Sequence, residues 1–360
     1  MKSTLLVGTR KGLIPFVFEN ENWKSQNVSF DGVPVSIAYA DPRNGRWWAC
    51  LDHGHWGVKL HFSDDRGANW SEVDPPAYPE GSEIKEGVPA SVKYLWAMAH
   101  GGVNHPDRLW IGTEPGGLFK SEDGGKTWQL NESLWNHPSR PDNWFGGGRD
   151  NAGIHSIFVD PRNEDRILVG VSCAGVFESN DGGETWEVKN KGLNAEFLPD
   201  PHAEVGHDPH LMVAANSNPD VLWQQNHCGI FVSENGAGSW TEVSEKEGPA
   251  NFGFAVAVAE DNPHQAWVAP AVSDMVRVAI DKALCICRTD DGGKTWKAFR
   301  NGLPQENCYD IVYRHCLVNS GETLAFGTTT GNLFFSSDRG ENWQVISHYL
   351  PMIYSLAFVD

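Results

Sequence analysis

One phrase recurs along this chain and limits its fold more than any other feature. SEDGGKTW begins at Ser121 and returns as SNDGGETW from Ser179 and as TDDGGKTW from Thr289. Looser copies bring the number to seven, and their closing tryptophans lie 47 to 58 residues apart: Trp23, Trp70, Trp128, Trp186, Trp240, Trp296 and Trp343. A repeat of this period predicts an array of one supersecondary unit, in which each copy buries its apolar faces against its neighbours.

The fourth repeat shows the expected unit most clearly. It contains four strand-like segments, IHSIFVD, RILVGVS, GVFESN and TWEVKN, between residues 154 and 190. The residues that separate them include Pro, Asn, Asp and Gly, which are typical of tight turns between antiparallel strands. The first two segments are nearly continuous apolar runs, as expected where both faces of a sheet are covered, and the polar fourth segment suits an outer edge.

The two ends of the chain complete this prediction. The sequence finishes in YSLAFVD, which resembles a first strand without a second, and starts in STLLVGT, which resembles a second strand without a first. Together they would form one blade and remove a free sheet edge. We therefore predict an all-β fold, with residues 1–360 in a single domain. It is a seven-bladed β-propeller of four-stranded antiparallel blades, closed by the C-terminal strand in the N-terminal blade.

The motif SxDxGxxW resembles the Asp-box, or BNR repeat, of sialidases, sortilin-type receptors, xyloglucanases and a photosystem II assembly factor. The resemblance covers all seven repeats and implies propeller blades, but the family includes enzymes, receptors and assembly factors alike. The chain does not resemble a true sialidase. Those enzymes open with Arg-Ile-Pro and normally have six blades, whereas here Ile14 and Pro15 lie four residues after Arg10.

Composition narrows the choice of partner. The 28 basic and 47 acidic residues give a formal charge of −19, which repels phosphate backbones and anionic lipids. We expect neither nucleic acid nor a membrane as a partner. The N-terminus has no secretory pattern, and the seven cysteines are odd in number and scattered, so we expect a cytoplasmic protein with reduced thiols.

The repeated acids of the box are poor catalytic candidates. An Asp at this position of a Gly-rich hairpin bonds the backbone amides of its own turn. The opposite end of each blade carries the loops from second to third strand and from blade to blade. The two longest insertions there cover residues 130–154 and 190–209. Because long loops on a rigid scaffold usually carry the specific contacts, we expect the site at this end.

Histidines form the densest group of candidates. His155 and His210 occupy the same position in neighbouring repeats, and His227 follows the second strand of the repeat that holds His210. With His207 or Glu204 they offer nitrogen and oxygen ligands suited to zinc, manganese or iron. The structural alternative is that these histidines cap loops or bond the backbone.

Carboxylates support a second interpretation. Glycoside hydrolysis needs two carboxyl groups across the scissile bond, and a tyrosine can assist proton transfer. The candidate catalytic residues are Glu114, Asp150, Glu204, Asp208 and Tyr309. The candidate substrate-binding residues are Arg10, Lys11, His53, His55, Trp56, Arg149 and Arg277.

We therefore predict a carbohydrate-active enzyme with its site in the central pore, either a glycoside hydrolase or a metal-assisted uronate lyase. Its partner would be a small molecule or an oligosaccharide. Two alternatives stay open: a non-catalytic scaffold or assembly factor that binds a protein, and a protein that binds a metal or small molecule without turnover. The sequence does not determine the oligomeric state.

Overall fold

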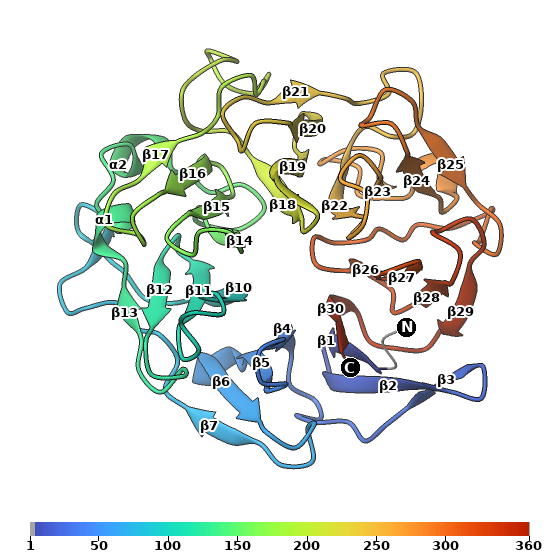
Figure 1. Ribbon diagram of the computed structural model, residues 1–360, viewed down its shortest axis with the longest axis horizontal. Helices are drawn as coiled ribbons and strands as arrows, with labels where there is room; N and C mark the ends of the chain where they lie inside the picture. The colour runs from blue at the N-terminus through green and yellow to red at the C-terminus, as the bar shows by residue number, and fades with distance from the viewer. Residues whose placement is uncertain (1–3, 360) are drawn as a thin grey trace. The chain divides into compact units, whose positions relative to one another are not determined.

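The fold is a seven-bladed β-propeller with four-stranded antiparallel blades, as the repeat predicts (Figure 1). The structure is a computed structural model that describes residues 4–359. The α-helices of this part are the single turns α1 (Glu132–Trp135) and α2 (Arg140–Asn143). No helix among residues 4–359 has the length and apolar character of a membrane span. The chain divides into two compact units, residues 39–209 and the remainder at its two ends.

Residues 39–209 hold the second to fourth repeats, and the first strand of the second repeat, β4, starts just before this unit. The blade strands are β4 (Val35–Ala40), β5 (Trp47–Asp52), β6 (Val58–Ser63), β7 (Ser71–Val73), β10 (Tyr94–His100), β11 (Leu109–Glu114), β12 (Leu118–Ser121), β13 (Gln129–Leu130), β14 (Ile154–Val159), β15 (Ile167–Val171), β16 (Gly175–Ser179) and β17 (Glu187–Val188). The unit also contains the 3₁₀ turn η1 (Gly54–Trp56) and a small hairpin of β8 (Glu83–Lys85) with β9 (Val88–Pro89).

The other unit holds four blades. Three of them follow the chain in order: β18 (Pro209–Ala215), β19 (Asn218–Asn226), β20 (Gly229–Ser233), β21 (Thr241–Glu242), β22 (Gly253–Val258), β23 (Ala266–Pro270), β24 (Ile286–Thr289), β25 (Lys297–Phe299), β26 (Leu317–Ser320), β27 (Thr323–Gly327), β28 (Leu333–Ser336) and β29 (Gln344–Ser347). The fourth consists of β1 (Thr4–Thr9), β2 (Gly12–Glu19), β3 (Asn22–Ser25) and β30 (Ile353–Val359), and η2 (Ile280–Lys282) lies outside the sheets.

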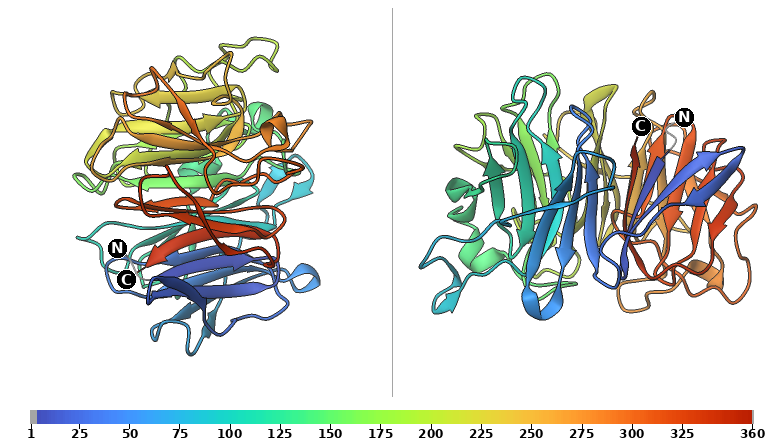
Figure 2. Two further views of the ribbon diagram at one scale, coloured as in Figure 1. Left: turned by 90° about the vertical axis from the view of Figure 1, so that its right-hand side faces the viewer. Right: turned by 90° about the horizontal axis from the view of Figure 1, so that it is seen from below.

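The C-terminal strand completes the N-terminal blade, which confirms the predicted closure. β30 pairs antiparallel with β1, with Leu6 opposite Ala357, in a sheet of order β3-β2-β1-β30. Figure 2 shows the two strands side by side, β1 in blue and β30 in dark red. Their apolar side chains therefore share one core, in which Leu5 and Val7 pack with Leu356.

Burial within a blade follows the predicted pattern. All five residues of β15 and all five of β16 are buried, whereas neither residue of β17 is. The apolar runs of the inner strands thus lie between neighbouring sheets. The outer strand is polar because its free edge faces water.

In the box, the acid accepts hydrogen bonds from other residues of its own turn. In the fourth repeat, Ser179 Oγ and Thr185 N both donate to Asp181 Oδ1, at 2.8 and 2.9 Å. These bonds, with those from the Thr185 hydroxyl, lower the pKa of Asp181 to about 2. Hydrogen bonds within the turn also lower the pKa of the equivalent acids: Asp65, Asp123, Asp291 and Asp338. The box acids are structural, as expected.

The box also fixes which end of each blade carries the variable loops. Gly182 N in the box donates to Asp165 O, at 2.9 Å, in the turn between the first and second strands. The same bond joins Gly124 to Asp107 in the preceding blade. Because the strands alternate in direction, the loops from second to third strand and from blade to blade lie at the other end.

Candidate functional site

The insertion of residues 130–154 is an ordered segment at the loop-bearing end of its blade. Asn131 begins α1, and its Oδ1 accepts a bond of 3.1 Å from Leu134 N as the helix cap. The Asn131 amide also donates to Gly183 O, at 2.8 Å, and Trp186 Nε1 donates to its Oδ1, at 2.9 Å. The neighbouring box therefore anchors the insertion.

Glu114, a predicted catalytic residue, makes an ion pair and hydrogen bonds with the neighbouring loop. It ends β11 with 2% of its surface exposed, and its Oε2 accepts a hydrogen bond from Arg149 Nε. Its Oε1 accepts bonds from the backbone and side-chain nitrogens of Asn151, at 3.2 and 3.3 Å. Both oxygens are therefore engaged. We interpret Glu114 as the group that orients Arg149 and Asn151.

Arg149, a predicted substrate-binding residue, is held on two sides. Besides its bond to Glu114, its guanidinium carbon lies 4.1 Å from the ring centroid of Tyr94 and 5.5 Å from that of Trp96. Its side chain is one-third exposed, at 33%. A guanidinium stacked on an aromatic face and bonded through Nε is pre-organised to present its other N–H groups.

An aromatic groove of about 240 Å³ lies beside this pair. Trp135, Trp144 and Phe145 supply its apolar walls, and Asp150 is its one carboxylate among the lining residues that the structure describes. Arg140 closes one side, because its Nη1 donates to Ile84 O of the β8–β9 hairpin, at 2.7 Å, and its guanidinium stacks on Trp135 at 3.9 Å. The groove combines apolar platforms with a few polar groups, which is the usual composition of a ligand site.

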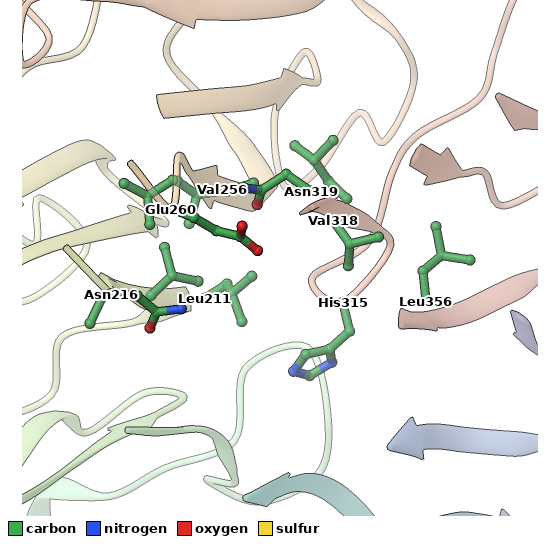
Figure 3. Close-up of a pocket in the computed structure, with 13 residues that line it drawn as sticks. Leu211, Asn216, Val256, Glu260, His315, Val318, Asn319 and Leu356 are labelled. Carbon is green, nitrogen blue, oxygen red and sulfur yellow. The ribbon is translucent and has the colours of Figure 1, made fainter. Parts of the chain in front are cut away.

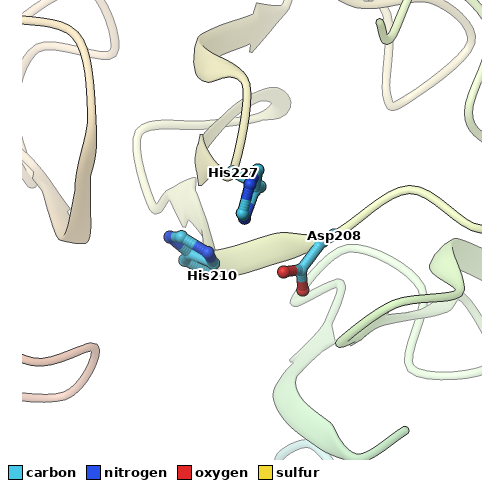
Figure 4. Close-up of side chains that lie close together, drawn as sticks. All are labelled: Asp208, His210 and His227. Atoms are coloured by element: carbon cyan, nitrogen blue, oxygen red, sulfur yellow. The ribbon is translucent and has the colours of Figure 1, made fainter. Parts of the chain in front are cut away.

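A second group lies at the entrance to β18. The rings of His210 and His227 lie there at a centroid distance of 5.7 Å and an angle of 77° (Figure 4). Asp208 and His210 are separated only by Pro209, and His227 lies in the β19–β20 turn of the same blade. The two imidazoles belong to the set of nitrogen ligands that the sequence predicts for a metal ion.

The two other predicted metal ligands lie outside this group. His155 is fully buried, with Nδ1 2.9 Å from Ser156 Oγ and its ring edge-on to Trp96. His207 is also fully buried, and its Nε2 donates to Ala203 O, at 2.7 Å. Burial is the main cause that lowers the pKa of His207 below its ordinary value, so the ring is neutral near pH 7. Both contacts resemble the structural role given above as the alternative.

The remaining candidates lie on separate segments. Glu204 and Tyr309 are exposed, and the Lys282 ammonium lies 5.9 Å from the Tyr309 ring. Arg277 lies 5.5 Å from Phe254, whose ring stacks on that of His210. The other substrate-binding candidates lie in two turns: Arg10 and Lys11 between β1 and β2, and His53, His55 and Trp56 at η1.

Sequence reasoning missed an apolar pocket of about 320 Å³ in the four-blade unit (Figure 3). Leu211, Val256 and Leu356 line it from β18, β22 and β30, with His315 and Glu260 as polar neighbours. It also missed two basic residues at the groove: Lys85 of the β8–β9 hairpin, which gave no strand signal, and Arg140 of the 130–154 insertion. The apolar pocket residues lie on inner strands, where an apolar side chain reads as core.

Comparison with known proteins finds partial sequence similarity to two xyloglucanases and structural similarity to propellers. No family model matches the sequence. An oligoxyloglucan-reducing end-specific xyloglucanase of Emericella nidulans is 30% identical over 166 residues, 45% of this chain. A probable enzyme of the same description from Neosartorya fischeri is 26% identical over 220 residues, 53% of this chain. The chain spans only 17% and 25% of the length of these relatives.

Solved structures agree on the architecture. The GH74 enzyme of Niastella koreensis matches 94% of this chain and 51% of its own, with a TM-score of 0.65 and 17% identity. YCF48 from Cyanidioschyzon merolae matches 93% of this chain and 95% of its own, with a TM-score of 0.55 and 16% identity. At such identities the likeness shows the fold alone.

Proposed function

We propose that this chain is a carbohydrate-active enzyme of the glycoside hydrolase type, which binds an oligosaccharide in the groove beside α1 and α2. One observation carries the proposal: an aromatic groove with a single exposed carboxylate, Asp150, lies next to a pre-oriented guanidinium, Arg149. The partial similarity to two xyloglucanases supports the same substrate class.

Each part of the groove has a distinct role in this proposal. The rings of Trp144 and Phe145 offer apolar surfaces to the C–H faces of sugar rings. Asp150 acts as one of the two carboxyl groups that hydrolysis requires. Arg149 donates to a substrate hydroxyl or carboxylate, and Glu114 fixes the direction of that donation.

The test is binding and turnover with a panel of neutral xyloglucan oligosaccharides and uronate oligosaccharides. We expect Trp144→Ala to weaken binding about 10-fold. We expect Asp150→Asn to reduce release of reducing ends by about 10² to 10⁴-fold and to leave binding nearly unchanged. The matched control is Asp142→Asn, an exposed acid in α2 that does not line the groove.

The outcomes separate the alternatives. Formation of an unsaturated uronate product would show that the reaction is elimination and not hydrolysis. Full turnover in Asp150→Asn would remove the catalytic role, and no binding to any sugar of the panel would overturn the proposal. A protein-binding propeller is then the better account, since Val272, Met275 and Val276 expose apolar side chains in one loop, with Met275 exposed to 87%.

A further inference from the structure

The apolar pocket of the four-blade unit has the size of a small-molecule site. Its volume is about 320 Å³, which falls at the lower end of the usual range for ligand pockets. Its wall comes from the inner strands β18, β22 and β26 together with β30, all of which belong to this unit. Leu211, Val256, Leu317 and Leu356 line it and are buried.

The walls of this pocket are aliphatic. Leucine, valine and alanine make up nine of the 13 described lining residues, and none of these 13 is Phe, Tyr or Trp. Such walls offer no ring on which a sugar can stack and few partners for its hydroxyl groups. The pocket therefore suits an aliphatic body, unlike the aromatic groove beside α1 and α2.

Four polar residues complete the lining: Asn216, Glu260, His315 and Asn319. Asn216 directly follows β18, and Glu260 lies two residues after β22, both in turns that lead to the second strand of their blade. The two residues are exposed, and Figure 3 shows the Glu260 carboxylate pointing toward the side chains of β26. One end of the pocket is therefore polar and open to water, whereas its interior is apolar.

Glu260 sets the charge of this polar end. It is the one acid among the described lining residues, and none of them is Lys or Arg. Its Oε2 accepts a hydrogen bond of 3.2 Å from Gly321 N, which holds the side chain against the β26–β27 turn. Its Oε1 accepts no hydrogen bond from the described residues, and Glu260 forms no ion pair with them. Since the chain carries a formal charge of −19, the pocket repels anions and attracts cations.

We infer that this pocket binds a small primary amine with an aliphatic body, as its ammonium ion. The ammonium group donates to Glu260 Oε1 and to the amide oxygen of Asn216 at the polar end. The alkyl chain fills the space bordered by Leu211, Val256 and Leu356, where each buried methylene strengthens binding about four-fold. The same chain with a carboxylate head is repelled by Glu260 and has no basic residue of the lining to pair with.

This site does not depend on the oligosaccharide groove, so its test needs no sugar. The full-length protein is titrated near pH 7 with butylamine, pentylamine and hexylamine in a calorimeter. Hexanol and hexanoate serve as ligands of equal chain length with a neutral and an anionic head. We expect one hexylamine per chain, a dissociation constant that falls about four-fold with each added methylene, and no binding of hexanoate. Hexanol should bind about 3- to 5-fold more weakly than hexylamine.

Two variants test the two ends of the ligand. Glu260→Gln removes only the charge and should weaken hexylamine binding about 3- to 5-fold while leaving hexanol binding unchanged. Ala214→Leu, at a half-buried lining position, adds carbon atoms to the pocket wall and should weaken both ligands at least about 10-fold. The matched control is Glu306→Gln, an exposed acid of the same unit outside the lining, which should bind as the wild type does. Circular dichroism checks the fold of each variant. Equal binding of hexylamine and hexanoate, or unchanged hexylamine affinity in either pocket variant, would overturn the inference.

Discussion

Asp181 and Asp208 show how the two ends of a blade differ. Asp181, in the box, accepts its hydrogen bonds from residues two and four positions away. Asp208, at the loop-bearing end, is buried and held by Ser172 and Cys173, which lie 36 and 35 positions earlier. Glu114 is held in the same long-range way by Arg149. Local contacts repeat from blade to blade, whereas the long-range contacts belong to single loops.

This difference separates structural from functional candidates. A turn that satisfies its own polar groups can be copied into every blade without regard to its neighbours. A side chain oriented by a distant segment serves one place only. The unrepeated ends are accordingly where we place the groove.

The first prediction tests whether the repeated tryptophan is structural. Trp186 is 8% exposed and bonds Asn131 of the neighbouring insertion, so Trp186→Ala should lower the free energy of unfolding by about 3 to 5 kcal/mol. Trp56, which is outside the repeat and 71% exposed, is the control. Trp56→Ala should change the free energy of unfolding by less than about 0.5 kcal/mol. Similar urea midpoints for the two variants would show that the repeated tryptophan stabilises the fold no more than an exposed tryptophan does.

The second prediction concerns the long-range ion pair. Glu114→Ala removes a buried carboxylate and leaves Arg149 and the Asn151 amide without their acceptor. We expect a loss of about 2 kcal/mol, below the usual range for fully buried pairs because Arg149 is partly exposed. Glu122, which is exposed and pairs with Arg108 at 3.0 Å, provides the comparison. Glu122→Ala should cost no more than about 1 kcal/mol, as measured by urea denaturation.

The fold was predictable because its signals are local. The box fixes the third and fourth strands of each blade, and the apolar runs identify the first and second. The closure followed from the two incomplete ends, and β30 pairs with β1 as predicted. The β8–β9 hairpin was missed, since EIKEGVP has neither alternation nor a recognised turn pair.

The sequence predicted which residues could belong to the site, but not which of them contact one another. Spacing placed Glu114 and Arg149 at one end of neighbouring blades but could not pair them, because that contact depends on how the 130–154 insertion folds. Similarly, His155 and His210 occupy equivalent positions in the sequence, and His207 was a further candidate ligand. They differ in what they bond: a serine hydroxyl, a local carbonyl and the carbonyl of the next blade.

The third prediction uses the box in which Asn235 replaces the acid. Asn235 makes the same turn bonds without charge, with Ser239 N donating to its Oδ1 at 2.9 Å. The turn lowers the pKa of Asp181 to about 2, below the unfolded value of about 3.9. The charge of Asp181 thus stabilises the fold above pH 4, and this contribution disappears as pH falls through 2.

Two reciprocal variants measure how much the charge of the box acid contributes to stability. Asp181→Asn should be less stable than the wild type at pH 6, by less than about 1 kcal/mol, with the gap closing toward pH 2. Asn235→Asp should be more stable at pH 6 and lose its gain over the same range. Chemical denaturation at several pH values follows both. A gap that does not change with pH would show that charge has no part in the turn.

The fourth and smallest effect is expected at Ala237, which stands where five of the other boxes have glycine. Its φ of +66° lies in the left-handed region, which is unfavourable for any residue with a Cβ. Ala237→Gly should raise the free energy of unfolding by about 0.5 kcal/mol, because relief of this strain exceeds the added chain entropy of glycine. Gly293→Ala is the opposite change, since its Cβ would lie 2.5 Å from Val243 Cβ. Thermal unfolding should therefore move upward in the first variant and downward in the second. A fall in both would mean that the Ala237 methyl contributes more by packing than its backbone strain removes.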